Sequence, residues 1–263
     1  MKLCMMTYTM ARQDFKIKDI IKTAVDLELE GIDWVSTYGY DPKELKKMSN
    51  DAGLSVACHT FFCNKLLNGD KNWLDEVKQS VDDAVVLGAP VIMIPTFNNA
   101  ELSRNAFRDF WIEALLEIVP VTDDAGITLT IENYHGCHSA FITADDYYKA
   151  KAAIPQLKLT YDNGNAAFGE NSIDSFKQSA DDVVHAHFKD WYISDQPKEG
   201  YKDSMVGKYF KPALIGEGDI DTVGCWNAMR DHNYDGFINI EYESSDIPAI
   251  EAMTKAVTYL RSL

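Results

Sequence analysis

Acidic side chains and imidazoles end four apolar runs in the second half of the chain. They are Glu132, Asp162, the pair His185 and His187, and Glu241 with Glu243 close behind it. Carboxylate and imidazole groups without thiolates suit Mn²⁺, Mg²⁺ or Co²⁺, and Zn²⁺ is also compatible. Brought together in a confined site, the carboxylates would repel one another strongly. One divalent ion offsets that repulsion better than the single charge of Lys189, so the pattern predicts a metal centre.

The elements that must position these residues are short β-branched, apolar runs. They alternate with longer amphipathic segments along the whole chain. Strands are predicted at 2–8, 32–36, 54–59, 90–95, 127–132, 158–162, 183–188 and 236–241. The runs are continuously apolar, which is typical of parallel strands covered on both faces.

Helical periodicity fills the segments between the strands. Helices are predicted at 18–30, 41–52, 73–87, 102–125, 143–153, 221–232 and 246–262. Asp41 before Pro42, and Thr143, are typical helix N-caps. Glycines before the next strand indicate C-caps at Gly31, Gly53, Gly88, Gly126 and Gly236. Residues 191–218 carry several Gly and Pro residues and are predicted to form a long functional loop.

Strict alternation of eight strands with about eight helices predicts an α/β fold with a parallel sheet. At 263 residues, a single (β/α)₈ TIM barrel spanning 1–263 is favoured over an open sheet. No G-x-G-x-x-G follows a strand, so nothing indicates dinucleotide binding. The carboxyl ends of barrel strands face the active site, which brings the four strand ends described above together.

The composition indicates which classes of binding partner and which cellular compartment to expect. A net charge of −16 opposes binding to phosphate backbones, so we expect no nucleic-acid partner, and it disfavours anionic membranes. Five cysteines without a C-x-x-C indicate a reducing compartment. No leader pattern or apolar run of 18 residues is present, and we therefore expect a cytoplasmic protein. The sequence does not decide whether the chain forms a homo-oligomer, as barrels commonly do.

Five motifs in a fixed order carry a family resemblance. They are IEN (131–133), YDNGN (161–165), HAHFKD (185–190), GEGDID (216–221) and GFINIEYE (236–243). The chain resembles the sugar phosphate isomerase/epimerase family of the xylose isomerase-like barrel superfamily over essentially its whole length. That superfamily includes ketose 3-epimerases, hydroxypyruvate isomerases, and inosose and 3-dehydroshikimate dehydratases. The resemblance implies that the metal ligands are Glu132, Asp162, His187 and Glu241.

The resemblance also separates the competing residues. It favours Glu241 over Glu243, and the second histidine of HAHFKD over the first. His185 should lie one layer deeper in the barrel, as a core histidine with satisfied hydrogen bonds. Asn165 stands where many members have a histidine, so it can bind a substrate hydroxyl but cannot shuttle a proton.

Further residues are expected to bind the substrate. His59, His135 and Lys189 lie near strand ends, where relatives contact their substrates, whereas His138 is expected to be an exposed loop residue. Aromatic residues near strand ends are candidates for a sugar-binding wall. They are Trp34, Tyr38, Phe61, Phe97 and Trp191. The sequence contains no cluster of basic residues that would indicate a phosphorylated substrate.

The resemblance implies an isomerase or epimerase acting on a sugar or polyol-derived ketone. Glu132 and Glu241 would exchange the proton next to the carbonyl through a metal-stabilised enediolate. A dehydratase using the same site is the main alternative. An apurinic-site endonuclease is a remote one, because Asn165 replaces a required histidine and the chain is strongly acidic. A metal-free binding protein is the third alternative.

Overall fold

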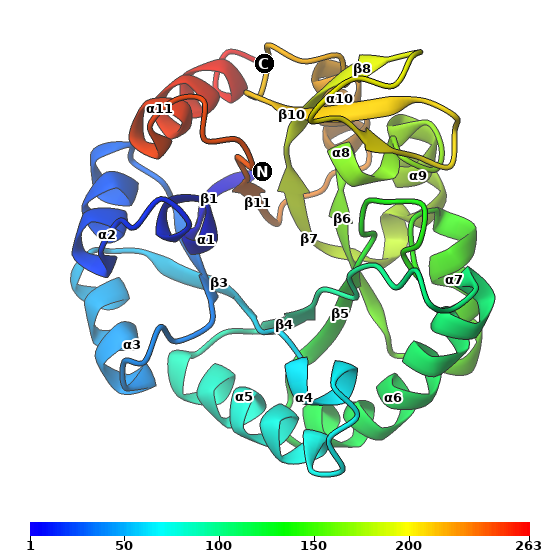
Figure 1. The fold of residues 1–263 in the computed structure, drawn as a ribbon. Coiled ribbons are helices and arrows are strands. Elements are labelled where there is room, and N and C mark those ends of the chain that lie inside the picture. Colours follow the sequence, from blue (N-terminus) through cyan, green and yellow to red (C-terminus); the bar gives the residue numbers. More distant parts are fainter.

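The computed structural model describes residues 1–263 as a closed barrel of parallel strands inside a ring of helices (Figure 1). The barrel strands are β1 (Lys2–Met6), β2 (Gly31–Val35), β3 (Ser55–Thr60), β4 (Val91–Ile94), β5 (Thr128–Glu132), β6 (Lys158–Asp162), β7 (Val183–Phe188) and β11 (Phe237–Ile240). They neighbour one another in chain order, and β11 pairs with β1 to close the ring. All eight predicted strands are present, and the predicted (β/α)₈ fold is confirmed.

Helices cover the outer face of the barrel, and short helical turns directly follow β1 and β6 at its mouth (Figure 1). They are α1 (Thr7–Ala11), α2 (Ile17–Asp26), α3 (Pro42–Asp51), α4 (Asn64–Leu67), α5 (Trp73–Leu87), α6 (Arg104–Asp124), α7 (Ala144–Ala153), α8 (Asn163–Ala166), α9 (Ser172–Ser179), α10 (Thr222–Asp231) and α11 (Ala249–Leu260), with a 3₁₀ turn η1 (Ala180–Asp182). Four of these helices, α1, α4, α8 and α9, were not predicted from the sequence. Three of these are single turns too short for periodicity to detect. No helix has the length and apolar character needed to cross a membrane.

Side-chain caps fix several helix ends as predicted. Asp41 accepts the backbone N–H of Lys43 at 2.9 Å, and Thr143 forms a capping box with Asp146. Positive φ angles occur at the three glycines that follow α3, α5 and α6, which confirms three of the predicted C-caps. They are Gly53, Gly88 and Gly126.

Two of the predicted glycine caps are wrong. Glu28 and Asn233 adopt the left-handed conformation after α2 and α10, with φ of 51° and 59°. Gly31 already belongs to β2, where a Cβ would lie 2.5 Å from the Phe237 ring. A glycine is therefore needed here because a side chain would collide with Phe237 of β11, and not because the chain turns.

The segment after β7 differs from the predicted irregular loop. It forms a three-stranded antiparallel sheet of β8 (Asp190–Ser194), β9 (Lys202–Asp203) and β10 (Tyr209–Ala213), in the order β8-β10-β9. Asp190 holds its base, since its carboxylate accepts the backbone N–H groups of Gly216, Gly218 and Ile220. The sheet lies on the rim of the barrel next to α8 (Figure 1). It brings Lys202 of β9 to the site described below.

Candidate metal centre and active site

Side chains from the ends of four barrel strands meet at the carboxyl end of the barrel. Glu132 ends β5, Asp162 ends β6, His187 lies on β7, and Glu241 directly follows β11. Their ligand atoms all lie within 4.8 Å of one another. His187 Nδ1 is 2.8 Å from Glu132, 3.5 Å from Glu241 and 4.0 Å from Asp162. The structure thus brings the four predicted metal ligands together.

The donor atoms of this cluster fit a divalent cation. Asp162 Oδ2 and Glu241 Oε2 are buried and make no hydrogen bond of good geometry, although the Lys189 ammonium forms an ion pair with each. Burial raises the pKa of Asp162 well above its ordinary value, although the charge of Lys189 opposes the shift. One ammonium leaves several buried carboxylates short of positive charge, and a cation held by oxygen and nitrogen ligands would supply it.

Lys189 supplies a permanent positive charge beside the cluster. Its Nζ lies 3.2 Å from Asp162, 3.0 Å from Glu241 and 2.7 Å from Glu243. Burial would lower the pKa of Lys189, but the carboxylates, led by Asp162 and Glu241, raise it well above its ordinary value. Glu243 lies outside the ligand cluster and also pairs with Lys202 at 3.3 Å. Contact between Lys189 and a substrate oxygen stays a prediction.

Asn133 clamps the backbone of Asp162. Its Nδ2 donates to the Asp162 carbonyl at 2.8 Å, and its Oδ1 accepts the Asp162 N–H at 2.8 Å. Asp162 Oδ1 accepts the N–H of Asn165 at 2.7 Å, which leaves Oδ2 for a cation. This role was not predicted from the sequence, although an amide directly after a strand-end acid was the available signal.

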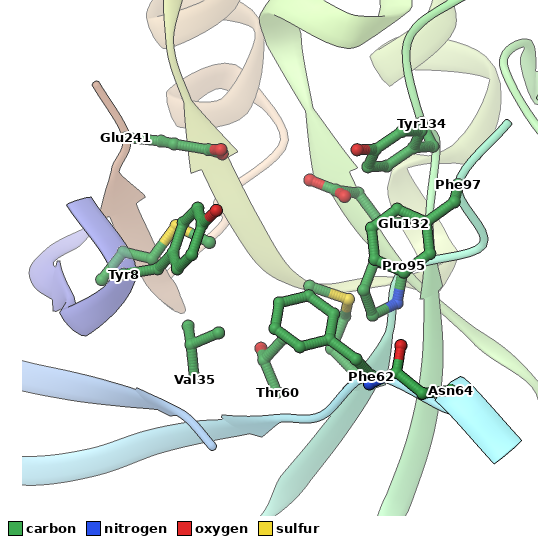
Figure 2. Close-up of a pocket in the computed structure, with 12 residues that line it drawn as sticks. Tyr8, Val35, Thr60, Phe62, Asn64, Pro95, Phe97, Glu132, Tyr134 and Glu241 are labelled. Atoms are coloured by element: carbon green, nitrogen blue, oxygen red, sulfur yellow. The ribbon is translucent and has the colours of Figure 1, made fainter. Parts of the chain in front are cut away.

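A cavity of about 310 Å³ opens beside the cluster (Figure 2). It is lined by Met6, Tyr8, Val35, Thr60, Phe62, Asn64, Met93, Pro95, Phe97, Glu132, Tyr134 and Glu241. Figure 2 shows the carboxylates of Glu132 and Glu241 pointing toward the space between them, with aromatic rings around it. Most of the wall is apolar, and no Lys or Arg lines it, so the cavity offers no clamp for a phosphate group.

The placement of His59 differs from the prediction. Its Nδ1 lies 2.8 Å from the carbonyl oxygen of Trp34, and the ring does not line the cavity. Thr60, the next residue of β3, does line it, because successive side chains of a strand point to opposite faces. Of the aromatic candidates only Phe97 lines the cavity, and Phe62 does so in place of Phe61.

His135 and Asn165 lie together behind the cavity wall. His135 Nδ1 lies 3.1 Å from Asn165 Oδ1, and Lys202 Nζ lies 2.7 Å from His135 Nε2. Because an ammonium only donates, Nε2 must be the acceptor and Nδ1 must carry the hydrogen. The ring stacks on Tyr134, which lines the cavity. Substrate contact by His135 and Asn165 stays a prediction, while His138 is exposed as expected.

The burial of His135 should be visible in the pH dependence of stability. Burial lowers its pKa from 6.5 to about 4. As pH falls, the unfolded chain binds a proton first, so the free energy of unfolding is unaffected by this histidine above pH 6.5 and falls progressively between pH 6.5 and pH 4. We expect the difference in unfolding free energy between wild type and His135→Gln to shrink by about 3 kcal/mol from pH 7 to pH 4. Urea titrations test this, with exposed His138→Gln as control; a constant difference for His135→Gln would contradict the assignment.

A second polar layer lies directly beneath the ligands. His185 is buried one layer below His187, as predicted, but the prediction that its hydrogen bonds are satisfied is wrong. Its Nε2 has no hydrogen-bond partner and lies 3.6 Å from Asp33 Oδ2. Asp33 was not predicted from the sequence, although an acid inside the otherwise apolar run of β2 was the available signal.

Fold and site define a TIM barrel with a carboxylate–histidine cluster at the carboxyl ends of its strands. The model of the xylose isomerase-like TIM barrel family matches residues 21–263. The chain therefore belongs to that family.

Curated relatives include inosose dehydratases. The protein from Lacticaseibacillus casei is 31% identical over 115 residues, which cover 40% of this chain and 37% of that protein. The protein from Halalkalibacterium halodurans is 24% identical over 201 residues, which cover 72% of this chain and 65% of that protein. The chain thus matches less than two thirds of the length of either relative.

Solved structures share the fold at low identity. The IOLI protein with a bound zinc atom superposes with a TM-score of 0.81 at 15% identity, covering 100% of this chain and 98% of that one. A probable 3-DHS dehydratase from Bacillus anthracis gives 0.77 at 17% identity, covering 99% of each chain. D-psicose 3-epimerase from Clostridium cellulolyticum, solved with D-tagatose, gives 0.77 at 12% identity, covering 100% and 99%.

Proposed function

We propose that this protein is a divalent-metal-dependent isomerase or epimerase acting on a sugar or polyol-derived ketone. The proposal rests on the positions of Glu132 and Glu241, which each serve two parts of the site. Both belong to the cluster of potential metal ligands, and both line the cavity. A substrate bound in this cavity would therefore lie between two carboxylates and beside the ion.

The ligands are Glu132, Asp162, His187 and Glu241. Oxygen and nitrogen donors without a thiolate favour Mn²⁺, Mg²⁺ or Co²⁺, and the zinc bound by a structural neighbour keeps Zn²⁺ among the candidates. When bound, the ion would supply Lewis-acid polarisation of substrate oxygens and compensate negative charge that develops on them. Asn133 and Lys189 would hold the ligand set in place.

Glu132 and Glu241 would move the proton. One carboxylate would accept the hydrogen bound to the carbon next to the carbonyl, and the other would return a proton at its own face. Lys189 lies 3.0 Å from Glu241 and keeps positive charge close to it. The apolar walls formed by Val35, Met93 and Pro95 would limit the access of water to the reacting carbon.

The cavity favours an uncharged substrate. No Lys or Arg lines it, and Lys189 and Lys202 both pair with Glu243. The aromatic rings that line it present faces on which the C–H surface of a sugar or cyclic polyol can pack.

A dehydratase is the second candidate, because inosose dehydratases are among the relatives. The same two carboxylates would remove the proton and then protonate a departing hydroxyl at the adjacent carbon. Isomerisation conserves the substrate's mass, whereas dehydration removes one water.

A panel assay tests the proposal. Unphosphorylated ketoses and cyclic polyol ketones, with their phosphorylated counterparts as controls, would be incubated with Mn²⁺-loaded protein and analysed by mass spectrometry and NMR. We expect conversion of an unphosphorylated ketone without change of mass. Loss of 18 mass units would establish the dehydratase instead, and exclusive turnover of phosphorylated substrates would contradict our account of the cavity.

A further inference from the structure

The two ring nitrogens of His187 face different surroundings. Nδ1 points to the ligand carboxylates and lies 2.8 Å from Glu132. Nε2 points into the barrel, is fully buried and has no hydrogen-bond partner. A neutral imidazole that gives Nδ1 to a metal ion carries its hydrogen on Nε2. Binding of the ion therefore creates a buried N–H group that needs an acceptor.

Asp33 is placed to be that acceptor. Its side chain is fully buried, and its Oδ2 lies 3.9 Å from His187 Nε2. Oδ2 accepts from Asn239 Nδ2 at 2.6 Å and from Thr60 Oγ1 at 3.2 Å. Oδ1 has no partner at all, so the carboxylate is fixed by β3 and β11 but retains the capacity to accept.

We propose that Asp33 is a positioning residue of the metal centre, whose carboxylate accepts the Nε2–H of His187 and so directs Nδ1 to the ion. The inference rests on the proposed metal-dependent function. Carboxylates in this role orient histidine ligands and fix their tautomer. A shift of about 1 Å closes the 3.9 Å separation to hydrogen-bond length. Asn239 and Thr60 then act through Asp33 by holding its carboxylate.

Asp33, His185 and His187 could instead bind a second cation, because their ligand atoms also lie within 4.8 Å of one another. Such a site would compete with the hydrogen bond proposed between His187 and Asp33. An Nε2 that binds an ion cannot carry a hydrogen. His187 would have to lose both ring protons to serve two ions at once. With an ion on Nδ1, the neutral ring makes Nε2 a donor, which favours the hydrogen bond to Asp33.

Zinc affinity of matched variants provides the first test. Asp33→Asn keeps the size of the side chain but places an amide donor beside Nε2, and Asp33→Ala removes the acceptor. We expect each to weaken Zn²⁺ binding 10- to 100-fold in competition with a chelator, the usual effect of losing such a partner. Thr160→Val is the control, because Thr160 pairs in register with His185 and bonds Thr130 at 2.8 Å. It should lower stability while leaving Zn²⁺ affinity within about twofold.

The tautomer of His187 provides the second test, and its main measurement is made on the wild type. In ¹⁵N spectra of Zn²⁺-loaded wild type, His187 should show a protonated Nε2 and a zinc-bound Nδ1, and Asp33→Asn should shift the Nε2 signal. Unchanged Zn²⁺ affinity in both Asp33 variants, two ions per chain, or an unprotonated Nε2 would overturn the positioning role alone. Wild type that binds no Zn²⁺, Mn²⁺ or Co²⁺ would overturn the proposed function as well.

Discussion

Replacing Glu132 or Glu241 with glutamine is expected to lower turnover by about a hundredfold or more with the metal site full, the usual worth of a positioned acid–base group. A glutamine amide oxygen can still bind a cation, but it cannot accept a proton from carbon. Both side chains line the cavity and reach the ligand cluster, so metal loading must be measured for each variant. Substrate affinity should fall much less than turnover.

Deuterium exchange separates the two faces of the substrate. In D₂O the wild type should exchange the hydrogen next to the carbonyl, and the variant that lacks the base for that face should not. Glu243→Gln is the comparison, because it removes a nearby carboxylate that is outside the ligand cluster. The loss of turnover in this variant should be smaller. Near-normal turnover of both metal-loaded variants would contradict these roles and assign the base to another group.

Asp162→Ala and His187→Ala are expected to weaken metal binding at least a hundredfold while the barrel stays folded. Asp162 Oδ2 and His187 Nδ1 face the cluster at the barrel mouth, and the packed layers that stabilise the barrel lie below them. His185→Ala should instead lower the free energy of unfolding by roughly 2 kcal/mol or more, as a large-to-small change in a packed interior. Its effect on metal binding should be smaller.

Metal analysis, circular dichroism and urea denaturation on the three variants check this division. If His185→Ala loses its metal and His187→Ala keeps it, then His185 is the metal ligand and His187 is the structural residue. Such a result would also remove the basis for the positioning role of Asp33.

The barrel was predictable because each of its strands has a local signature. The predicted bounds 158–162 and 183–188 agree with β6 and β7, and the residues of both strands are buried or half-buried, as expected for strands covered on both faces. The sheet of β8–β10 was not predictable in this way. Its strands lie on the rim, where half-exposed residues such as Tyr192 and Lys211 do not form an apolar run.

The grouping of the four ligands followed from the order of the strands, because the carboxyl ends of parallel strands meet at one end of a barrel. Which side chains point inward did not follow. A continuously apolar strand gives no alternation from which to read its phase, and a one-residue slip exchanges its two faces. The register between β2 and β3 shifts after Ile32, and Thr60 rather than His59 faces the cavity.

The central claim is that Glu132, Asp162, His187 and Glu241 hold one divalent ion. Anomalous diffraction from crystals of Mn²⁺- or Co²⁺-loaded protein tests it most directly, together with metal content per chain. We predict one anomalous peak within bonding distance of these four side chains, and one ion per chain in solution. No bound ion, or a peak elsewhere such as at His135 and His138, would contradict the account.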